Sequence, residues 1–340
     1  METLLLLLPL LAVVILANLG ERHRRSPYVI FRDARANALA GRALRYSSYG
    51  LLIAINVGLL GFAGLAVLNQ LVTMLMPEQV EPAALATNWW GVAVASLLTS
   101  LFAFLPLVPA VRRRLARWLP FDPDSIVHTT ALSLAVYQIG LSLGQMALIG
   151  DLENLLEADL ALTTSDLLLS ALPLLLFALA GVGLFIRRGG RSTLQRLGLV
   201  RPTWKHWLAA AGVTLLLLAF DFGVRLLWYE VDPIGHDLVA EVTENLFGNL
   251  ASVGGAIALG LSAGISEELL FRGAVQPRLG LLLATVLFAV GHLQYGLSVA
   301  TLEIFVIGLV LGVMRARTST TIAIVIHASY NALGVLLGLS

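Results

Sequence analysis

Long runs of apolar residues, separated by short polar stretches, occur along the whole 340-residue chain. About ten of these runs approach or exceed the 20 or so residues that an α-helix needs to cross a bilayer. They lie near residues 4–20, 48–76, 89–111, 126–149, 165–186, 206–229, 249–276, 279–297, 299–314 and 319–338. This pattern predicts an all-α polytopic membrane protein with about ten transmembrane helices.

The polar stretches between the runs carry charges of alternating sign. One set carries arginine and lysine, at residues 22–45, 112–117, 187–205, 278 and 315–317. The other set carries aspartate and glutamate without any lysine or arginine, at residues 78–81, 151–159 and 230–244. Because positive loops stay on the cytoplasmic side, we expect the first set in the cytoplasm and both termini outside.

The first apolar run has the charge order of a transmembrane helix. Glu2 is the only charge before it, and Arg22 and Arg24 follow it. A secretory signal carries its positive charges first, so we expect a first transmembrane helix here.

The composition supports an integral membrane protein. Hydrophobic residues make up 58% of the chain and charged residues 13%, which is far more apolar than a soluble domain. The absence of cysteine excludes disulfides and thiolate metal sites. A net charge of +1, with no basic helix carrying interleaved aromatic residues, gives no indication of nucleic-acid binding. Many arginines, a single lysine and no cysteine favour a bacterial cytoplasmic membrane.

A cytoplasmic linker is predicted between two halves of the chain. It is bounded by Gly189 and Gly190 on one side and by Arg201 and Pro202 on the other. We therefore expect a transmembrane region of unassigned role at residues 1–186 and a second domain at residues 187–340. No internal repeat indicates a transporter of the inverted-repeat kind.

Two arginines fall inside apolar runs instead of in cytoplasmic loops. Arg225 follows Asp221 by four residues, and Arg272 follows Glu268 by four. Residues at this spacing share one face of a helix, so both arginines are predicted to form intramembrane ion pairs.

The segment around Arg272 is the strongest candidate for chemistry. Glu267, Glu268 and Arg272 lie together in an otherwise apolar stretch. Each ionisable group at membrane depth costs about 2.5–3.5 kcal/mol on insertion scales, so such a cluster is rarely present for packing alone.

Three predicted helices bring polar residues to a similar depth. Counted from Arg278 at 1.5 Å per residue, Glu267 lies about 16 Å and His292 about 21 Å into the membrane. His327 lies about 15 Å in, counted from Arg317. The sequence therefore predicts that one glutamate and two histidines meet inside the last four helices.

A buried carboxylate and histidines can activate water in two ways. The glutamate can act as a general base, or the side chains can hold a divalent metal that lowers the pKa of bound water. Histidine and asparagine can stabilise an oxyanion, and Asn331 follows His327 by one helical turn. Together these abilities indicate peptide-bond hydrolysis, although no His-Glu-x-x-His or Gly-x-Ser-x-Gly motif is present.

Three short motifs follow one another on successive predicted helices. They are Glu-Glu-x-x-x-Arg at 267–272, Phe-x-x-x-His at 288–292 and His-x-x-x-Asn at 327–331. Each is weak alone, but the ordered set resembles the CPBP family, which comprises the type-two CAAX prenyl endopeptidases and bacteriocin-processing (ABI) relatives. The resemblance covers roughly residues 190–340. It implies an intramembrane endopeptidase acting on a membrane-associated protein or peptide.

The resemblance also implies roles for individual residues. Glu267 and His292 would position the attacking water, and His327 and Asn331 would stabilise the oxyanion. Family members are described both as metalloproteases and as glutamate-dependent enzymes without tightly held metal. A divalent metal such as zinc, if bound, would be held by Glu267, His292 and His327.

The two adjacent glutamates are expected to have different tasks. Neighbouring helical residues point about 100° apart, so Glu267 and Glu268 cannot share one orientation. We assign Glu268, which is four residues from Arg272, to orientation and charge balance, and Glu267 to water activation. The alternative function is a non-catalytic transporter or scaffold that uses the same buried polar cluster.

Overall fold

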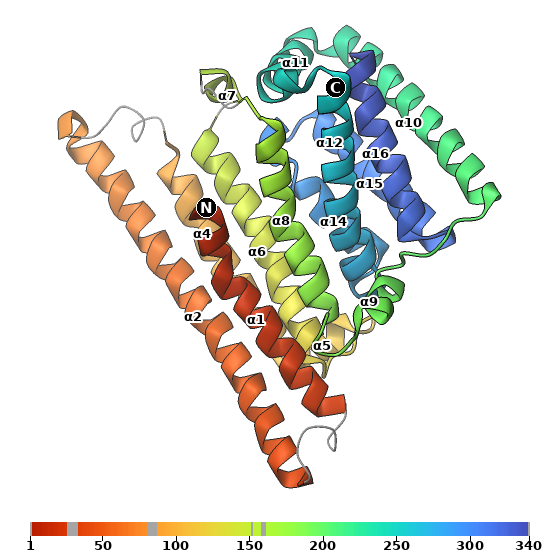
Figure 1. Ribbon diagram of the computed structural model, residues 1–340. Helices are drawn as coiled ribbons and strands as arrows, with labels where there is room; N and C mark the ends of the chain where they lie inside the picture. Colours follow the sequence, from red (N-terminus) through yellow and green to blue (C-terminus); the bar gives the residue numbers. More distant parts are fainter. Residues whose placement is uncertain (1, 26–32, 80–86, 151, 158–160, 339–340) are drawn as a thin grey trace. The chain divides into compact units, whose positions relative to one another are not determined.

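The computed structural model describes residues 2–25, 33–79, 87–150, 152–157 and 161–338 (Figure 1). Within these ranges the chain forms helices and turns and no strand beyond an isolated bridge between Leu184 and Arg188. The prediction of an all-α fold is confirmed. Three residues of the predicted acidic loops, Glu81, Asp151 and Asp159, lie outside the described ranges.

Eight helices in the described part of the chain are long and apolar enough to cross a membrane. They are Ala34–Leu75, Trp89–Leu107, Ile126–Ile149, Thr164–Val182, Trp204–Val231, Val253–Leu279, Val299–Arg317 and Thr320–Leu337. The predicted run at 4–20 lies within helix α1 (Glu2–Arg25), and the longest helix within the run at 279–297 is the ten-residue α14 (Leu281–Val290). The polytopic membrane fold is therefore supported, while the number ten is not confirmed.

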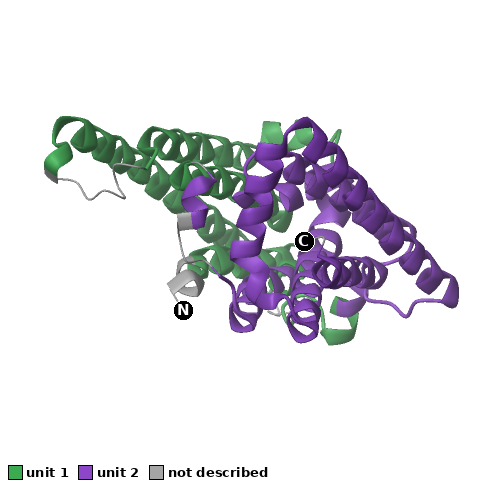
Figure 2. Ribbon diagram, turned by 90° about the horizontal axis from the view of Figure 1, so that it is seen from above, with its two compact units in different colours: residues 1–150, 179–193 green, residues 151–178, 194–340 purple. Residues whose placement is uncertain are grey.

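The chain divides into two compact units (Figure 2). Unit 1 comprises residues 1–150 and 179–193, and unit 2 comprises residues 151–178 and 194–340. The units differ from the predicted division after residue 186, because residues 151–178 pack with the C-terminal helices. Leu162 N donates a hydrogen bond to Leu246 O (2.8 Å), and Ser262 Oγ donates one to Leu167 O (2.8 Å).

Unit 1 contains the N-terminal helices. Its elements are α1, α2 (Ala34–Leu75), η1 (Pro77–Gln79), α4 (Trp89–Phe104), η2 (Leu105–Leu107), α5 (Pro109–Leu115) and α6 (Ile126–Ile149). Glu21, which is fully buried, accepts a hydrogen bond from Ile126 N (3.1 Å) and pairs with Arg24 (2.7 Å). Arg24 also pairs with Asp122 (2.6 Å), so one arginine links the end of α1 to the loop before α6.

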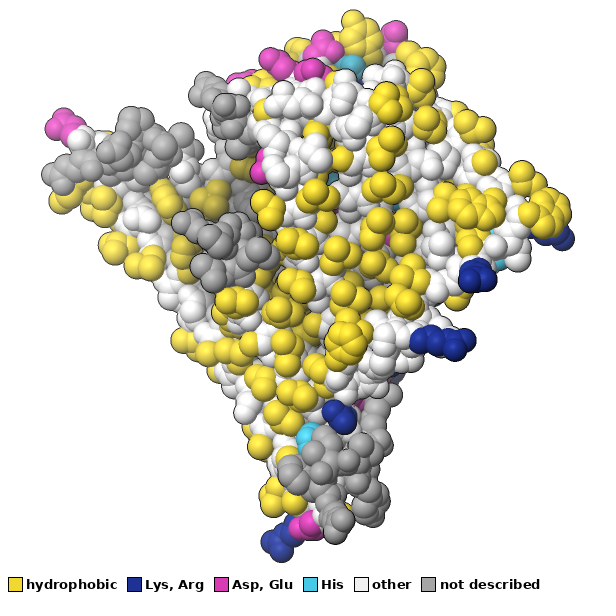
Figure 3. Space-filling view, viewed as in Figure 1, with side chains coloured by type: hydrophobic (Ala, Val, Ile, Leu, Met, Phe, Trp, Pro, Cys, Tyr) yellow, Lys and Arg dark blue, Asp and Glu magenta, His cyan; other side chains and the backbone are white. Residues whose placement is uncertain are grey.

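Unit 2 contains every residue of the three motifs. Its elements are α7 (Glu153–Glu157), most of α8 (Thr164–Val182), the end of α9 (Gly190–Arg196), α10 (Trp204–Val231), α11 (Pro233–Phe247), η3 (Gly248–Leu250), α12 (Val253–Glu267), the π-helix η4 (Glu268–Val275), α13 (Gln276–Leu279), α14, η5 (Leu293–Tyr295), α15 (Val299–Arg317) and α16 (Thr320–Leu337). Acidic side chains gather around α11, and lysine and arginine gather near α9 and the start of α10, with an apolar surface between them (Figure 3). This separation of charge agrees with the alternating loops, and the cytoplasmic assignment stays a prediction.

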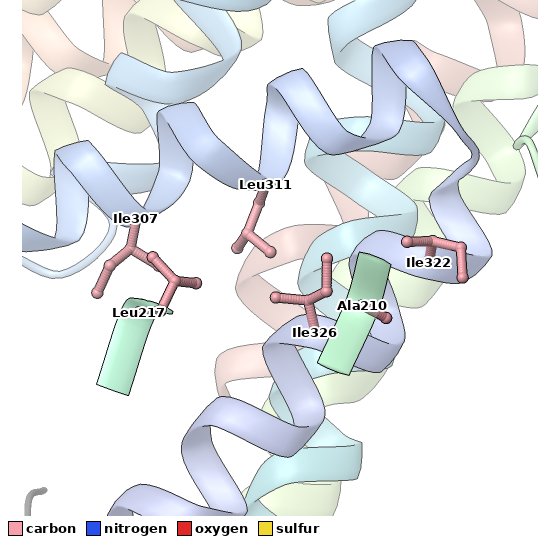
Figure 4. Packing of buried hydrophobic residues seen from close by; sticks show 6 residues of the cluster. All are labelled: Ala210, Leu217, Ile307, Leu311, Ile322 and Ile326. Carbon is pink, nitrogen blue, oxygen red and sulfur yellow. The ribbon is translucent and has the colours of Figure 1, made fainter. Parts of the chain in front are cut away.

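An apolar core joins α10, α15 and α16 (Figure 4). Buried residues on each helix recur at intervals of four or seven, which places them on one helical face. They are Ala210 and Leu217, Ile307 and Leu311, and Ile322 and Ile326. This core fixes the helices that carry Gly308 and His327 against each other.

Helices α12 and α16 approach closely because glycine faces the contact. A Cβ atom added at Gly264 would lie 2.9 Å from the backbone nitrogen of Ala328, and one added at Gly260 would clash with Ala328 O. Small residues of this kind allow membrane helices to pack with their backbones in contact. The glycine pair thereby brings the end of α12, and Glu268 directly after it, close to His327, which precedes Ala328 on α16.

We expect Gly264→Ala to destabilise the protein by about 1–3 kcal/mol, because the added methyl group overpacks the contact between α12 and α16. Gly254→Ala is the matched control, since it changes a glycine of the same helix with nothing within 4 Å of the added atom. Thermal unfolding in detergent, followed by tryptophan fluorescence, measures the difference. Equal unfolding temperatures for the two variants would show that the close contact is unimportant.

Candidate active site

The motif glutamates lie at the junction between an α-helix and a π-helix. Glu267 is the last residue of α12, and Glu268 is the first residue of η4. The sequence predicted a regular helix here, and the structure has the wider π geometry over eight residues instead. Such segments are rare and often occur at functional sites. The junction leaves the two adjacent carboxylates beside different partners.

Glu268 is fully buried and lies between the side chains of Arg272 and His327. One carboxylate oxygen lies 3.2 Å from Arg272 Nε, and the other lies 3.0 Å from Nδ1 of His327. The expected ion pair between Glu268 and Arg272 is therefore present. The contact with His327 joins the first motif to the third.

Arg272 is almost completely buried and is held on two further sides. Its Nη2 donates a hydrogen bond to Gly308 O (3.0 Å), and its guanidinium carbon lies 4.1 Å from the centre of the Phe288 ring. A Cβ atom at Gly308 would lie 2.8 Å from Phe288 and 3.4 Å from Arg272 Nη2. Glycine at this position of α15 therefore makes room for the cation–π contact.

Glu267 lies beside His292, with 3.9 Å between Glu267 Oε2 and His292 Nε2. Nδ1 of His292 lies 2.9 Å from the backbone oxygen of Phe288, which assigns the ring proton to Nδ1 and leaves Nε2 as an acceptor in the neutral ring. Among the described residues no donor bonds to Glu267 Oε2, which is buried. Because both atoms are acceptors, they cannot hydrogen-bond to each other, and a small molecule with two donor groups suits the 3.9 Å between them.

Phe288 lies at the centre of the cluster. Its ring centre lies 4.9 Å from that of His292, 5.7 Å from that of His327 and 5.6 Å from that of Phe271. The residue is 2% exposed. The sequence predicted no separate role for Phe288 within its motif. In the structure its ring contacts residues of all three motifs.

The third motif supplies two side chains from α16. His327 is buried with its Nδ1 at Glu268, and Asn331 follows it by one helical turn and is partly exposed. These two residues are four apart, so they share one face of α16.

Comparison with known proteins concerns the same segment. Residues 249–333 match the family model described as Rce1-like, Type II CAAX prenyl endopeptidase Rce1-like. The resemblance to this family is confirmed. The match covers about a quarter of the chain and includes all three motifs. A search of curated proteins found no match, and a search of solved structures found none either.

Residues 249–333 are thus similar to the CAAX-type membrane proteases, which are hydrolases that act on proteins or peptides. The match is shorter than the predicted span of roughly 190–340, and it leaves residues 1–248 outside. Protease chemistry is therefore supported for unit 2 in particular.

The side chains of the three motifs are not arranged as the expected metal-ligand set. In the described ranges, no group of three or more histidine, aspartate or glutamate side chains is arranged to hold a metal ion. Glu267 and His292 lie together, but His327 directs Nδ1 to Glu268. Catalytic zinc is bound by three protein ligands, so this donor set does not fit it.

A second polar cluster lies away from the three motifs. Asp221 pairs with Arg225 on α10 (3.2 Å), as expected, and the carboxyl group of Glu303 on α15 lies near that of Asp221. The proximity of Asp221 to Glu303 was missed because no local spacing connects the two residues.

We expect Phe288→Leu to destabilise the protein by about 2 kcal/mol or more, because the desolvated contact with Arg272 is lost. Peptide cleavage should fall as well, since both histidines lose a packing partner. Phe222→Leu, on the exposed face of α10, is the control. The measurement is thermal unfolding of both variants in the same detergent. If the two variants unfold together, Phe288 is not the central packing residue of the site.

Proposed function

We propose that the protein is an intramembrane endopeptidase that hydrolyses a peptide bond of a membrane-associated protein or peptide. The observation that carries the proposal is the pairing of Glu267 Oε2 with His292 Nε2 across 3.9 Å. The match of residues 249–333 to a CAAX prenyl endopeptidase family supports the reaction class. Glu268 is already engaged by Arg272 and His327, so Glu267 is the motif carboxylate available for water.

In the proposed reaction a water molecule donates hydrogen bonds to Glu267 and to His292. Glu267 takes one proton as the water oxygen bonds to the carbonyl carbon of the substrate. The carbon–nitrogen bond then breaks, and the leaving nitrogen receives that proton from Glu267. His292 remains oriented throughout by its bond to Phe288 O (2.9 Å).

We assign the stabilisation of the negative charge that develops on the carbonyl oxygen to His327 and Asn331. With Nδ1–H directed at Glu268, the imidazolium form of His327 presents a second donor at Nε2. The amide of Asn331 adds a neutral donor from the next turn.

The proposed substrate enters from within or beside the bilayer, because the site belongs to membrane-spanning helices. A prenylated Cys-a-a-X tail is the first substrate class to test, since the matching family is described by that specificity. Peptide maturation and turnover of membrane proteins are further forms of the same activity. An unbiased comparison of peptides is therefore the better first measurement.

We expect Glu267→Gln to abolish cleavage while expression and folding persist, because the amide cannot take a proton from water. Glu241→Gln, an exposed glutamate of α11, is the control and should retain wild-type activity. Peptides released from membranes that contain each protein are compared by mass spectrometry, together with cleavage of a farnesylated Cys-a-a-X peptide in proteoliposomes. A fully active Glu267→Gln variant would falsify the assignment and favour a non-catalytic transporter or scaffold.

We expect chelators such as EDTA and 1,10-phenanthroline to change the cleavage rate by less than about twofold, because the described side chains do not supply a three-ligand zinc set. The rate of peptide cleavage is measured before and after treatment, and again after zinc is added. Loss of activity that zinc restores would contradict this expectation and establish a metalloprotease.

A further inference from the structure

The π-helix η4 is fastened to its surroundings by side chains that donate to backbone carbonyls. Arg272 donates to Gly308 O (3.0 Å), and Gln276, directly after the π-helix, donates to Gly312 O (2.8 Å). On the opposite side, Arg196 donates to Gly273 O (2.8 Å). Thus α15 receives two bonds from the segment that begins at Glu268.

The two bonds to α15 are spaced alike on both elements. Arg272 and Gln276 are four residues apart, and so are the glycines Gly308 and Gly312 that accept from them. One such contact would let the segment pivot about it, whereas two contacts a turn apart fix both its position and its rotation. The glycines at 308 and 312 therefore mark the face of α15 whose backbone carbonyls accept hydrogen bonds from side chains. The same face also packs closely against its neighbours.

Rotation matters here because the π geometry is locally unusual. Relaxation of η4 to a regular α-helix would change its hydrogen-bond pattern from i→i+5 to i→i+4 and turn the residues after the junction about the helix axis. Either Arg272 and Gln276 would then leave the carbonyls of α15, or Glu268 at the other end would leave His327. A contact that prevents rotation at the C-terminal end of η4 therefore also keeps Glu267 and Glu268 in place at its N-terminal end.

We propose that Gln276 is a positioning residue, which fixes the register of the π-helix through Gly312 and thereby holds Glu267 and Glu268 at their separate partners. The inference rests on the proposed function for its effect on catalysis. Gln276 is 6% exposed, and its bond to Gly312 O is buried. A displacement of about 1 Å at a catalytic group can cost on the order of 100-fold in rate, so a distant bond can matter.

The absence of a side chain at Gly312 leaves room for the hydrogen bond from Gln276. A Cβ atom there would clash with Leu281 Cδ1 and lie 3.2 Å from Gln276 Oε1. A methyl group at this position therefore presses on the glutamine side chain that donates to the α15 carbonyl. Changes at either end of the bond should produce the same functional defect.

Gln276→Met tests the bond with little change of volume. The substitution removes the donor, and it also removes Gln276 Oε1, a buried acceptor that no described residue satisfies, so a small change in stability is expected. Ser262→Ala is the matched control, because it removes another side-chain bond of 2.8 Å between a helix and a carbonyl in the same unit. Gly312→Ala is paired with Gly212→Ala, where nothing lies within 4 Å of the added atom.

Hydrogen exchange and kinetics are measured on the full chain in proteoliposomes. For Gln276→Met and Gly312→Ala we expect amides of residues 268–275 to exchange about 5- to 10-fold faster. With a farnesylated Cys-a-a-X peptide, kcat should fall about 10- to 100-fold while KM stays within about twofold. Both control variants should match the wild type in exchange over residues 268–275 and in kcat.

The outcomes separate the two proposals. Unchanged exchange over residues 268–275 in Gln276→Met overturns the positioning role, and this readout needs no substrate. Faster exchange with unchanged kcat also overturns it, because the π-helix would then move without effect on the reaction. An active Glu267→Gln variant instead overturns the proposed function, whatever the exchange results are.

Discussion

A fully buried glutamate must be neutralised within the membrane, and this requirement organises unit 2. Glu268 satisfies it with Arg272 on its own segment and His327 on α16. Arg272 in turn needs Gly308 O and the Phe288 ring, because a buried guanidinium without partners would be costly. These contacts reach α14, α15 and α16, so a single ionic requirement brings together the helices that carry the three motifs.

The same requirement separates the tasks of the adjacent carboxylates. Since Glu268 is committed to charge balance, Glu267 is left beside His292 with a buried oxygen to which no described residue donates. The π geometry that begins at Glu268 accompanies this divergence. Glycine at 264 and 308 then permits the close approach of α16 and Phe288, because any side chain at either position would occupy the space of a neighbour.

The second polar cluster, formed by Asp221, Arg225 and Glu303, follows the same physical rule in a different way. An arginine four residues from an aspartate provides local neutralisation, and a carboxyl group from another helix lies nearby. In both clusters a buried acid and an arginine four residues away share the charge. The difference lies at Glu267, whose nearest ionisable partner, His292, stays 3.9 Å away.

Sequence alone determined the features that depend on composition and local spacing. Apolar runs and loop charges indicated a polytopic membrane protein, four-residue spacing indicated the pairs Asp221–Arg225 and Glu268–Arg272, and the ordered motifs indicated the family. Only the tertiary structure decided that His327 lies at Glu268, that residues 268–275 form a π-helix and that residues 151–178 pack with unit 2. The physical reason is that spacing along one helix sets which side chains share a face. Distances between helices depend instead on which small residues let two backbones meet, and no local pattern states which partner lies opposite.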